Sequence, residues 1–117
     1  MRGILCDTMA QRMPLTREFK DTVQARAKAD AAFRAALLSE VIDLFLAGDM
    51  ATGKSVLRDY INATIGFATL ADVTGVPAKS LMRMVSASGN PRADNLFAII
   101  SALQDATGVQ LSVSAAA

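Results

Sequence analysis

Residues 67–86 read FATLADVTGVPAKSLMRMVS, and no other stretch of the chain has a spacing that demands so specific a geometry. In the first half of this stretch a small residue is followed, four positions later, by a glycine, then an apolar residue and a proline. Glycine readily takes the left-handed conformation that ends a helix, and proline suits the start of the next helix. The stretch therefore predicts two short helices joined by a tight turn, a helix-turn-helix. Its framework residues are Ala71, Gly75, Val76, Leu81 and Met84.

The second of these helices, from Ala78 onward, has two faces of different chemistry. At about 100° per residue the apolar side chains gather on one side. Arginine pairs with guanine through two hydrogen bonds, lysine reaches guanine or phosphate, and serine is an adaptable partner. The polar face therefore favours insertion into the major groove of DNA over the alternative of an ordinary solvated helix. It carries Lys79, Arg83 and Ser86, flanked by Ser80 and Met82.

The composition bounds the fold and the strength of any electrostatic binding. The chain has 117 residues, is 52% hydrophobic and contains three prolines, which predicts one compact all-helical domain. Its net charge is only +1, but residues 76–95 carry Lys79, Arg83 and Arg92 against Asp94. So few cations give a modest affinity for DNA, and useful binding at cellular salt requires two subunits on one site.

Several chemistries are excluded by what the chain lacks. It has no histidine and one cysteine, Cys6, so histidine-based triads and zinc sites cannot be assembled within one chain. No apolar run approaches the roughly 20 residues of a membrane span, and the first residues lack the apolar length of a secretion signal. We therefore expect a cytoplasmic protein that is not an enzyme and uses no cofactor, metal, membrane or small-molecule substrate.

Capping residues and glycines divide the chain into helices. Apolar stripes predict the buried side chains, among them Phe19, Val23, Phe33, Leu37, Val41, Leu44, Phe45, Val56, Leu57, Tyr60, Ile61, Ile65, Leu96, Ile99, Ile100 and Leu103. The expected order begins with a helix from Thr16 to about Ala29, a helix capped by Asp30 and ended by Gly48, and a helix capped by Asp49 and closed by Gly66. The two helices of the motif follow, then the loop Ser88–Pro91, and last a helix from about Ala93 to Gly108.

The end of the chain has the alternation of a short strand, with Val109, Leu111 and Val113 separated by polar residues. A single strand must pair with another to be stable, so we expect it to pair with a second copy of the chain or with a partner. The expected organisation is a disordered leader at 1–14, an N-terminal helical extension at 15–47, a helix-turn-helix DNA-binding domain at 48–113 and a tail at 114–117.

Residues 48–55, GDMATGKS, match the phosphate-binding pattern G-x-x-x-x-G-K-[ST], so a nucleotide-binding enzyme is an alternative. A phosphate-binding loop requires a buried strand before it and a second strand ending in a magnesium-binding aspartate. The preceding residues, 33–47, have helical spacing instead. We therefore interpret Gly48 as a helix stop, Asp49 as a cap and Lys54 as a surface cation.

Two longer segments carry a family resemblance. They are DAAFRAALLSEVIDLFLAGD at 30–49 and GKSVLRDYINATIGFATLADVTGVPAKSLMRMVSASGNPRADNLFAIISALQDATGVQLSV at 53–113. Together they resemble the antidote proteins of addiction modules, the HigA-like antitoxins of the Xre class, whose helix-turn-helix is similar to that of phage lambda repressor. The resemblance covers about Leu15 to Val113. It implies a five-helix core, repression of the protein's own operon, and neutralisation of a RelE-like toxin that cleaves messenger RNA.

The resemblance also implies roles for individual residues. Lys79, Ser80 and Arg83 would contact DNA bases, and the next helix N-terminus would contact phosphate through Asn90, Arg92 and Asn95. Many relatives place a longer polar residue where this chain has Ala68 and Thr69, so the hydroxyl of Thr69 would substitute weakly.

The resulting expectation is a homodimeric repressor of operator DNA that doubles as the antitoxin of a cognate small toxin. The helices from Thr16 to Ala47 are the expected toxin surface, since DNA docking does not need them. The alternatives are a stand-alone Xre or phage-type repressor with no toxin, the nucleotide-binding enzyme, and a toxin-binding scaffold without DNA affinity.

Overall fold

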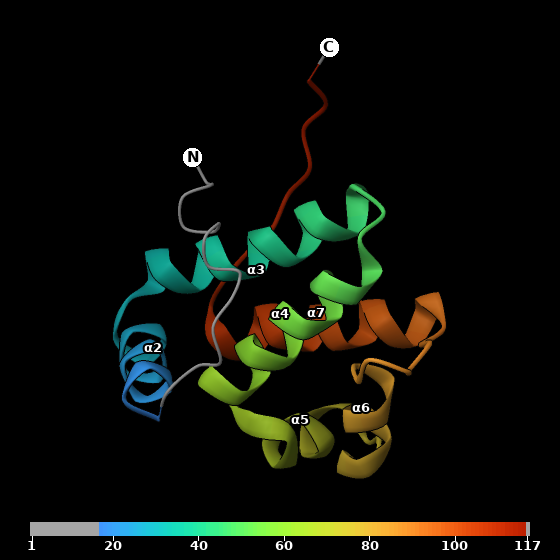
Figure 1. Ribbon diagram of the computed structural model, residues 1–117, viewed down its shortest axis with the longest axis horizontal. Helices are drawn as coiled ribbons and strands as arrows, with labels where there is room; N and C mark the ends of the chain where they lie inside the picture. The colour runs from blue at the N-terminus through green and yellow to red at the C-terminus, as the bar shows by residue number, and fades with distance from the viewer. Residues whose placement is uncertain (1–16, 117) are drawn as a thin grey trace.

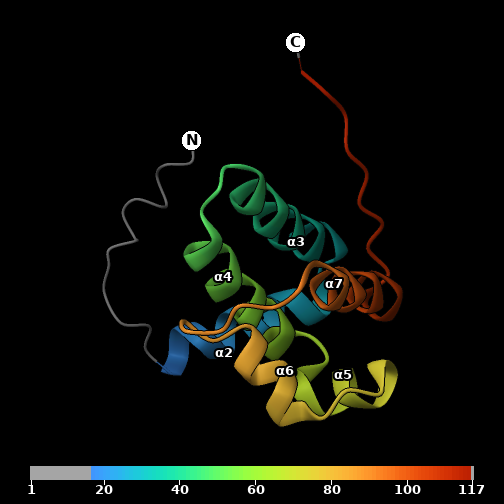
Figure 2. The same ribbon diagram turned by 90° about the vertical axis from the view of Figure 1, so that its right-hand side faces the viewer.

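The computed structural model describes residues 17–116, and every regular element there is a helix (Figures 1 and 2). The predicted all-α class is therefore confirmed. The expected leader at 1–14 and the expected cap Thr16 lie outside the described residues. Numbered as in Figure 1, the helices are α2 (Arg17–Ala29), α3 (Ala31–Leu46), α4 (Met50–Ala63), α5 (Gly66–Thr74), α6 (Ala78–Met84) and α7 (Ala93–Thr107).

Helix α4 lies at the centre of the fold and packs against α2, α3 and α5, with its longest contact along α3. In Figure 2, α7 lies on the side of the molecule opposite α4, and α5 and α6 form the lower edge. The predicted stripe of α7 is confirmed by its burial, and Leu57, Tyr60 and Ile61 of the predicted α4 stripe are buried as well. Leu38 on α3 is fully buried and was not predicted. The buried core comprises Leu38, Val41, Leu57, Tyr60, Ile61, Phe67, Leu70, Leu81, Val85, Leu96, Ile99, Ile100, Ala102, Leu103 and Val109.

The remaining stripe residues of α3 and α4 lie at the edge of this core. Phe33, Leu37, Leu44, Phe45, Val56 and Ile65 are half-buried rather than buried. The side chains of Phe19 and Val23 lie outside the described residues.

Two aspartates begin helices as the sequence predicts. The carboxylate of Asp30 accepts hydrogen bonds from the backbone N–H groups of Ala32 at 3.0 Å and Phe33 at 3.2 Å. The Phe33 N–H is the main reason that the pKa of Asp30 lies below its ordinary value. Asp49 accepts from the N–H of Thr52 at 3.2 Å in the same way. Each carboxylate satisfies backbone donors that have no partner inside the helix.

The junction between α4 and α5 differs from the prediction. Helix α4 ends at Ala63 with Thr64 as its C-cap, and the Thr64 hydroxyl donates to the carbonyl of Tyr60 at 2.7 Å. Gly66, expected to close this helix, is instead the first residue of α5 and has a φ of 78°. The helix ends slightly before the predicted position, and Gly66 has the left-handed conformation at the junction.

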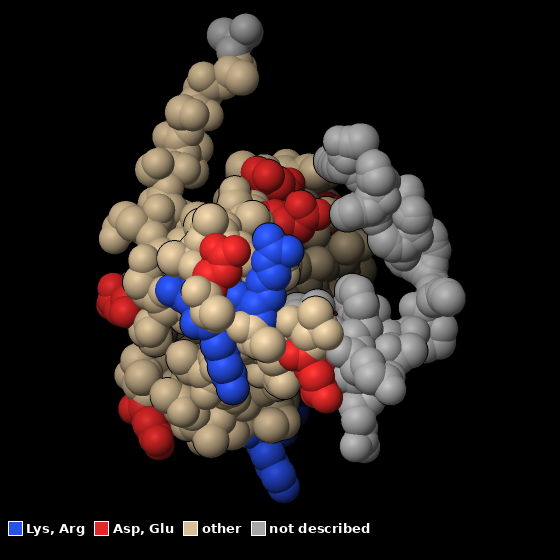
Figure 3. All heavy atoms as spheres, turned by 90° about the vertical axis from the view of Figure 1, so that its left-hand side faces the viewer, with Lys and Arg blue, Asp and Glu red and all other residues tan. Residues whose placement is uncertain are grey.

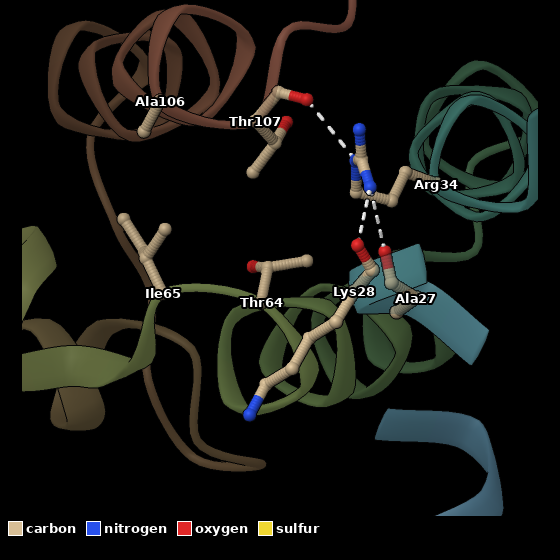
Figure 4. A pocket seen from close by; sticks show the side chains of 7 residues that line it. All are labelled: Ala27, Lys28, Arg34, Thr64, Ile65, Ala106 and Thr107. Carbon is tan, nitrogen blue, oxygen red and sulfur yellow. Dashed lines mark hydrogen bonds between the residues drawn. The ribbon is translucent and has the colours of Figure 1, made fainter. Parts of the chain in front are cut away.

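Arg34 of α3 joins the ends of two other helices. Its guanidinium donates to the carbonyls of Ala27 at 2.9 Å and Lys28 at 3.2 Å at the end of α2, and to that of Thr107 at 3.1 Å at the end of α7. Figure 4 shows these bonds on one side of a shallow hollow of about 190 Å³ between the same helix ends. The last carbonyls of a helix have no intrahelical partner and lie at the negative end of its dipole, so a cation stabilises both.

Residues 109–116 form no strand in this single chain. Val109 is buried against the core, whereas Val113 is 79% exposed. The N–H of Leu111 donates to the side-chain oxygen of Gln104 at 2.7 Å, and beyond it the chain extends away from the helices (Figures 1 and 2). The predicted strand is therefore not confirmed, because nothing within residues 17–116 pairs with its backbone as a second strand.

Replacing Tyr60 by phenylalanine should lower stability and remove an alkaline transition. Burial raises the pKa of Tyr60 above its ordinary value of 10.0, and its hydroxyl lies 2.7 Å from that of Thr107. The neutral phenol therefore stabilises the fold fully below about pH 10, and this contribution declines as the pH rises through the higher folded-state pKa.

We expect Tyr60→Phe to lower the free energy of unfolding by about 1 kcal/mol near pH 7, since one buried hydrogen bond is lost. Urea denaturation at neutral and alkaline pH measures both effects. Tyr60 is the one tyrosine of the chain, so its phenolate absorbance reports the pKa directly. An unchanged alkaline decline in Tyr60→Phe would show that another group causes it.

Candidate nucleic-acid interface

Helices α5 and α6 are joined by a turn that the structure holds at three points. Gly75 has a φ of 77°, and its N–H donates to the carbonyl of Ala71 at 2.8 Å. The Thr74 hydroxyl donates to Leu70 O at 2.8 Å and accepts from the N–H of Val76 at 3.3 Å. A side chain with a β-carbon is disfavoured at this φ, so the glycine sets the direction in which α6 leaves the turn.

Helix α6 begins at Ala78, as the sequence predicts. Pro77 is the N-cap, with a ψ of 142°, and not the first helical residue. Its backbone is extended, and the helix begins one residue later. The N–H of Leu81 still bonds to the Pro77 carbonyl at 3.1 Å, so the first helical bond forms as usual.

Helix α6 buries one face and exposes the other, as its periodicity predicts. Leu81 is 1% exposed, and Val85 at the C-cap is fully buried. On the opposite side Lys79 and Arg83 are exposed, and Met82 is 48% exposed. Helix α6, which carries these two cations, lies beside α5 at the lower edge of the molecule in Figure 1.

Lys54 of α4 is not the surface cation that the sequence analysis predicts. It is 7% exposed, and its ammonium group donates to the carbonyl oxygen of Gly89 and to that of Ala87 at 3.4 Å. Its aliphatic stem can lie in the core because the charged end is hydrogen-bonded. Lys54 shares a helical stripe with Leu57 and Ile61, and this spacing is the signal that could have predicted its burial.

Two further features hold the chain that leaves α6. The guanidinium of Arg58, one turn after Lys54 on α4, donates to the carbonyl of Val85 at 2.6 Å. Gly89 packs so closely on the end of α6 that a β-carbon there would collide with the carbonyl of Arg83 and lie 2.7 Å from that of Met84. The loop is therefore fixed against α6 on one side and bound by α4 on the other.

The loop and the start of α7 carry the remaining predicted contacts. The expected helix break at Ser88–Pro91 is confirmed, and Asn90 is exposed within it. Arg92, the N-cap of α7, is exposed and lies 3.6 Å from a carboxylate oxygen of Asp94. An ion pair this exposed contributes little stability, so Arg92 can exchange Asp94 for another anion at small cost.

The other predicted contact residues are placed less favourably. Thr69 is exposed on α5, whereas Ser80 and Asn95 are half-buried. Ser86 lies beyond the end of α6, is half-buried, and donates its hydroxyl to the carbonyl of Arg83 at 2.7 Å. Of the residues predicted on α6, Lys79 and Arg83 are thus the two that are fully available to a ligand.

The basic side chains do not gather into a broad patch on the face that carries α2. On this left-hand face of the molecule, Lys and Arg lie among Asp and Glu (Figure 3). The net charge of the whole chain is only +1, so a strong overall field is not expected.

Residues 48–55 do not form a phosphate-binding loop. The segment becomes helical at Met50, and the N–H of Gly53 donates to the carbonyl of Asp49 at 3.0 Å. A phosphate-binding loop needs backbone N–H groups that point at the ligand, whereas those of Thr52 and Gly53 are bonded to Asp49. The ammonium group of Lys54 is committed to two carbonyls as well.

No family model, curated protein or solved structure matches this chain. Within residues 17–116, no helix is long and apolar enough to cross a membrane. The same residues contain no group of three or more His, Cys, Asp or Glu side chains that could hold a metal ion.

Replacing Lys54 by methionine should destabilise the fold, whereas the same replacement of Lys79 should not. Lys54→Met leaves the carbonyls of Ala87 and Gly89 without their buried donor, which costs roughly 1–3 kcal/mol. Lys79→Met removes an exposed cation, for which we expect a change within about 0.5 kcal/mol. Chemical denaturation of the two variants measures the difference, and equal stabilities would contradict the structural role of Lys54.

Proposed function

We propose that this protein is a sequence-specific DNA-binding repressor that reads the major groove with α6. The observation that carries the proposal is the pairing of a buried and a cationic face on α6, which a locked turn holds at a fixed angle to α5. A short helix held by its apolar face is the arrangement with which a helix-turn-helix presents side chains to base edges.

In this mechanism the position of each cation on α6 determines which DNA group it contacts. Arg83 pairs with guanine through two hydrogen bonds, Lys79 reaches guanine or phosphate, and Ser80 supplies an adaptable contact. Thr69, Asn90, Arg92 and Asn95 contact the phosphate backbone around the groove and set the register. The remaining predicted contact, Ser86, would have to release the hydrogen bond of its hydroxyl to the carbonyl of Arg83. With so few cations per chain, two copies bind one palindromic operator, with their α6 helices about 34 Å apart in successive major grooves.

The family resemblance supports a second part of the proposal, that the repressor is the antitoxin of an addiction module. It would repress its own operon and neutralise a RelE-like toxin by binding it. Helices α2 and α3 expose many side chains that DNA docking does not use, so they are the candidate toxin surface. Co-expression with the neighbouring reading frame tests this part, and a repressor that binds DNA but retains no product of that frame would be a stand-alone Xre-type repressor.

Two arginine variants should affect DNA binding differently. Arg83→Ala should weaken binding to the preferred sequence by roughly 1–3 kcal/mol and relax the base preference, because it removes a base contact. Arg92→Ala should weaken binding to all sequences alike and reduce the salt slope by about one, because it removes a phosphate contact. Gel-shift titrations at two salt concentrations, on a selected operator and on random DNA, separate the two effects.

The matched control is Lys28→Ala, which removes an exposed cation from α2, away from α6. It should leave both the affinity and the salt slope unchanged. If Arg83→Ala lost affinity equally on operator and random DNA, Arg83 would not read bases. If no DNA bound the unaltered protein at low salt, the proposed function would be wrong.

A further inference from the structure

Half of the exposed large apolar side chains lie around one groove. Among the residues whose side chains are described, six large apolar side chains are exposed. Three of them, Leu46 at 73%, Phe97 at 63% and Val113 at 79%, line a groove of about 360 Å³ between α3, α7 and the C-terminal segment. Exposed apolar side chains scattered singly are ordinary, but a cluster in one groove marks a surface that is covered in the working protein.

The C-terminal segment forms one wall of this groove and then continues beyond it. Val109 anchors the segment in the core, and Gln104 holds the N–H of Leu111. Residues 112–116 are exposed and extend away from the helices (Figures 1 and 2). An extended backbone that carries an exposed valine presents both apolar surface and hydrogen-bonding groups to a second molecule.

We propose that a second copy of this chain occupies the groove, so that the α3, α7 and C-terminal surface is the homodimer interface. Each copy has an apolar groove and, next to it, an apolar extended segment. A twofold axis would place the extended segment of each copy against the groove of the other. Phe97, an exposed aromatic side chain beside the groove, is the central anchor, since aromatic side chains dominate the energetics of interfaces.

The charge of the groove favours a second copy over a strongly basic partner. Of the side chains that line it, Asp43 is the one that carries a charge. A basic partner would be matched by several carboxylates, whereas a nearly uncharged lining suits contact between identical surfaces. One carboxylate per copy can remain at the polar rim.

The groove lies apart from α6, so a second copy in the groove would leave α6 free to bind DNA. This step rests on the proposed function. In Figure 2, α7 and the C-terminal segment lie on the right-hand side, whereas α6 is at the lower edge and stays accessible.

The proposed interface covers only part of the outer surface of α3. The half of α3 from Ser39 to Leu46 contributes to the dimer groove. The earlier half of α3 and helix α2 remain exposed for another protein. The candidate toxin surface is therefore limited to α2 and the first half of α3.

Sedimentation analysis of the full chain without DNA tests the interface directly. We expect the unaltered protein to be a dimer at micromolar concentrations. Phe97→Glu and Val113→Asp should each weaken dimerisation by at least about 30-fold, because each places a charge in the apolar contact. Val73→Glu is the control, since Val73 is also 55% exposed but lies on α5, outside the groove. Circular dichroism verifies that every variant keeps its helical content.

Each outcome decides the inference independently of DNA binding. A monomer at all concentrations, or a dimer that survives both groove substitutions, would overturn it. A dimer that only the groove substitutions dissociate would support it. If that dimer bound no DNA, the interface would stand and the proposed function would fail. If the protein bound operator DNA as a dimer unaffected by Phe97→Glu, the function would stand and the assigned interface would fail.

Discussion

The path of the loop that follows α6 depends on one buried ammonium group. Helix α6 has only seven residues, and a helix this short is unstable alone. Burial of Leu81 and Val85 holds one face of α6, while Lys54 binds the loop that follows, at Gly89 and Ala87. A buried charge is tolerated only when it is hydrogen-bonded, so the loop must pass over Lys54 for the fold to be stable. This requirement couples the exposed face of α6 to the core of the domain.

Three basic side chains have the same role at the ends of helices. Arg34 binds the last carbonyls of α2 and α7, and Arg58 and Lys54 bind carbonyls at and after the end of α6. Carbonyls there lack intrahelical partners, and the helix dipole is negative at that end. These cations serve the fold and are not available to a ligand. Lys79 and Arg83 on α6 and Arg92 at the start of α7 are exposed instead.

The described part of the protein has one cationic surface and one apolar surface, and the two lie apart. The cationic face of α6 suits a polyanion, and the apolar groove beside α7 and the C-terminal segment suits a second protein surface. Neither surface covers the other, so both can be occupied at once. The segment after Val109 lines the second surface and contributes the exposed side chain of Val113 to it.

The sequence by itself determined the all-helical class, the caps Asp30 and Asp49, the turn at Gly75 and the two faces of α6, because each depends on residues a few positions apart. It placed the end of α4 at Gly66, whereas the helix ends at Ala63. Only the tertiary structure decided that Lys54 is structural, because its acceptors lie 33 and 35 residues further along the chain. The apolar groove was likewise decided by tertiary structure, since it forms where three elements distant in sequence meet. Long-range contacts of this kind are set by how the helices pack, which local periodicity does not encode.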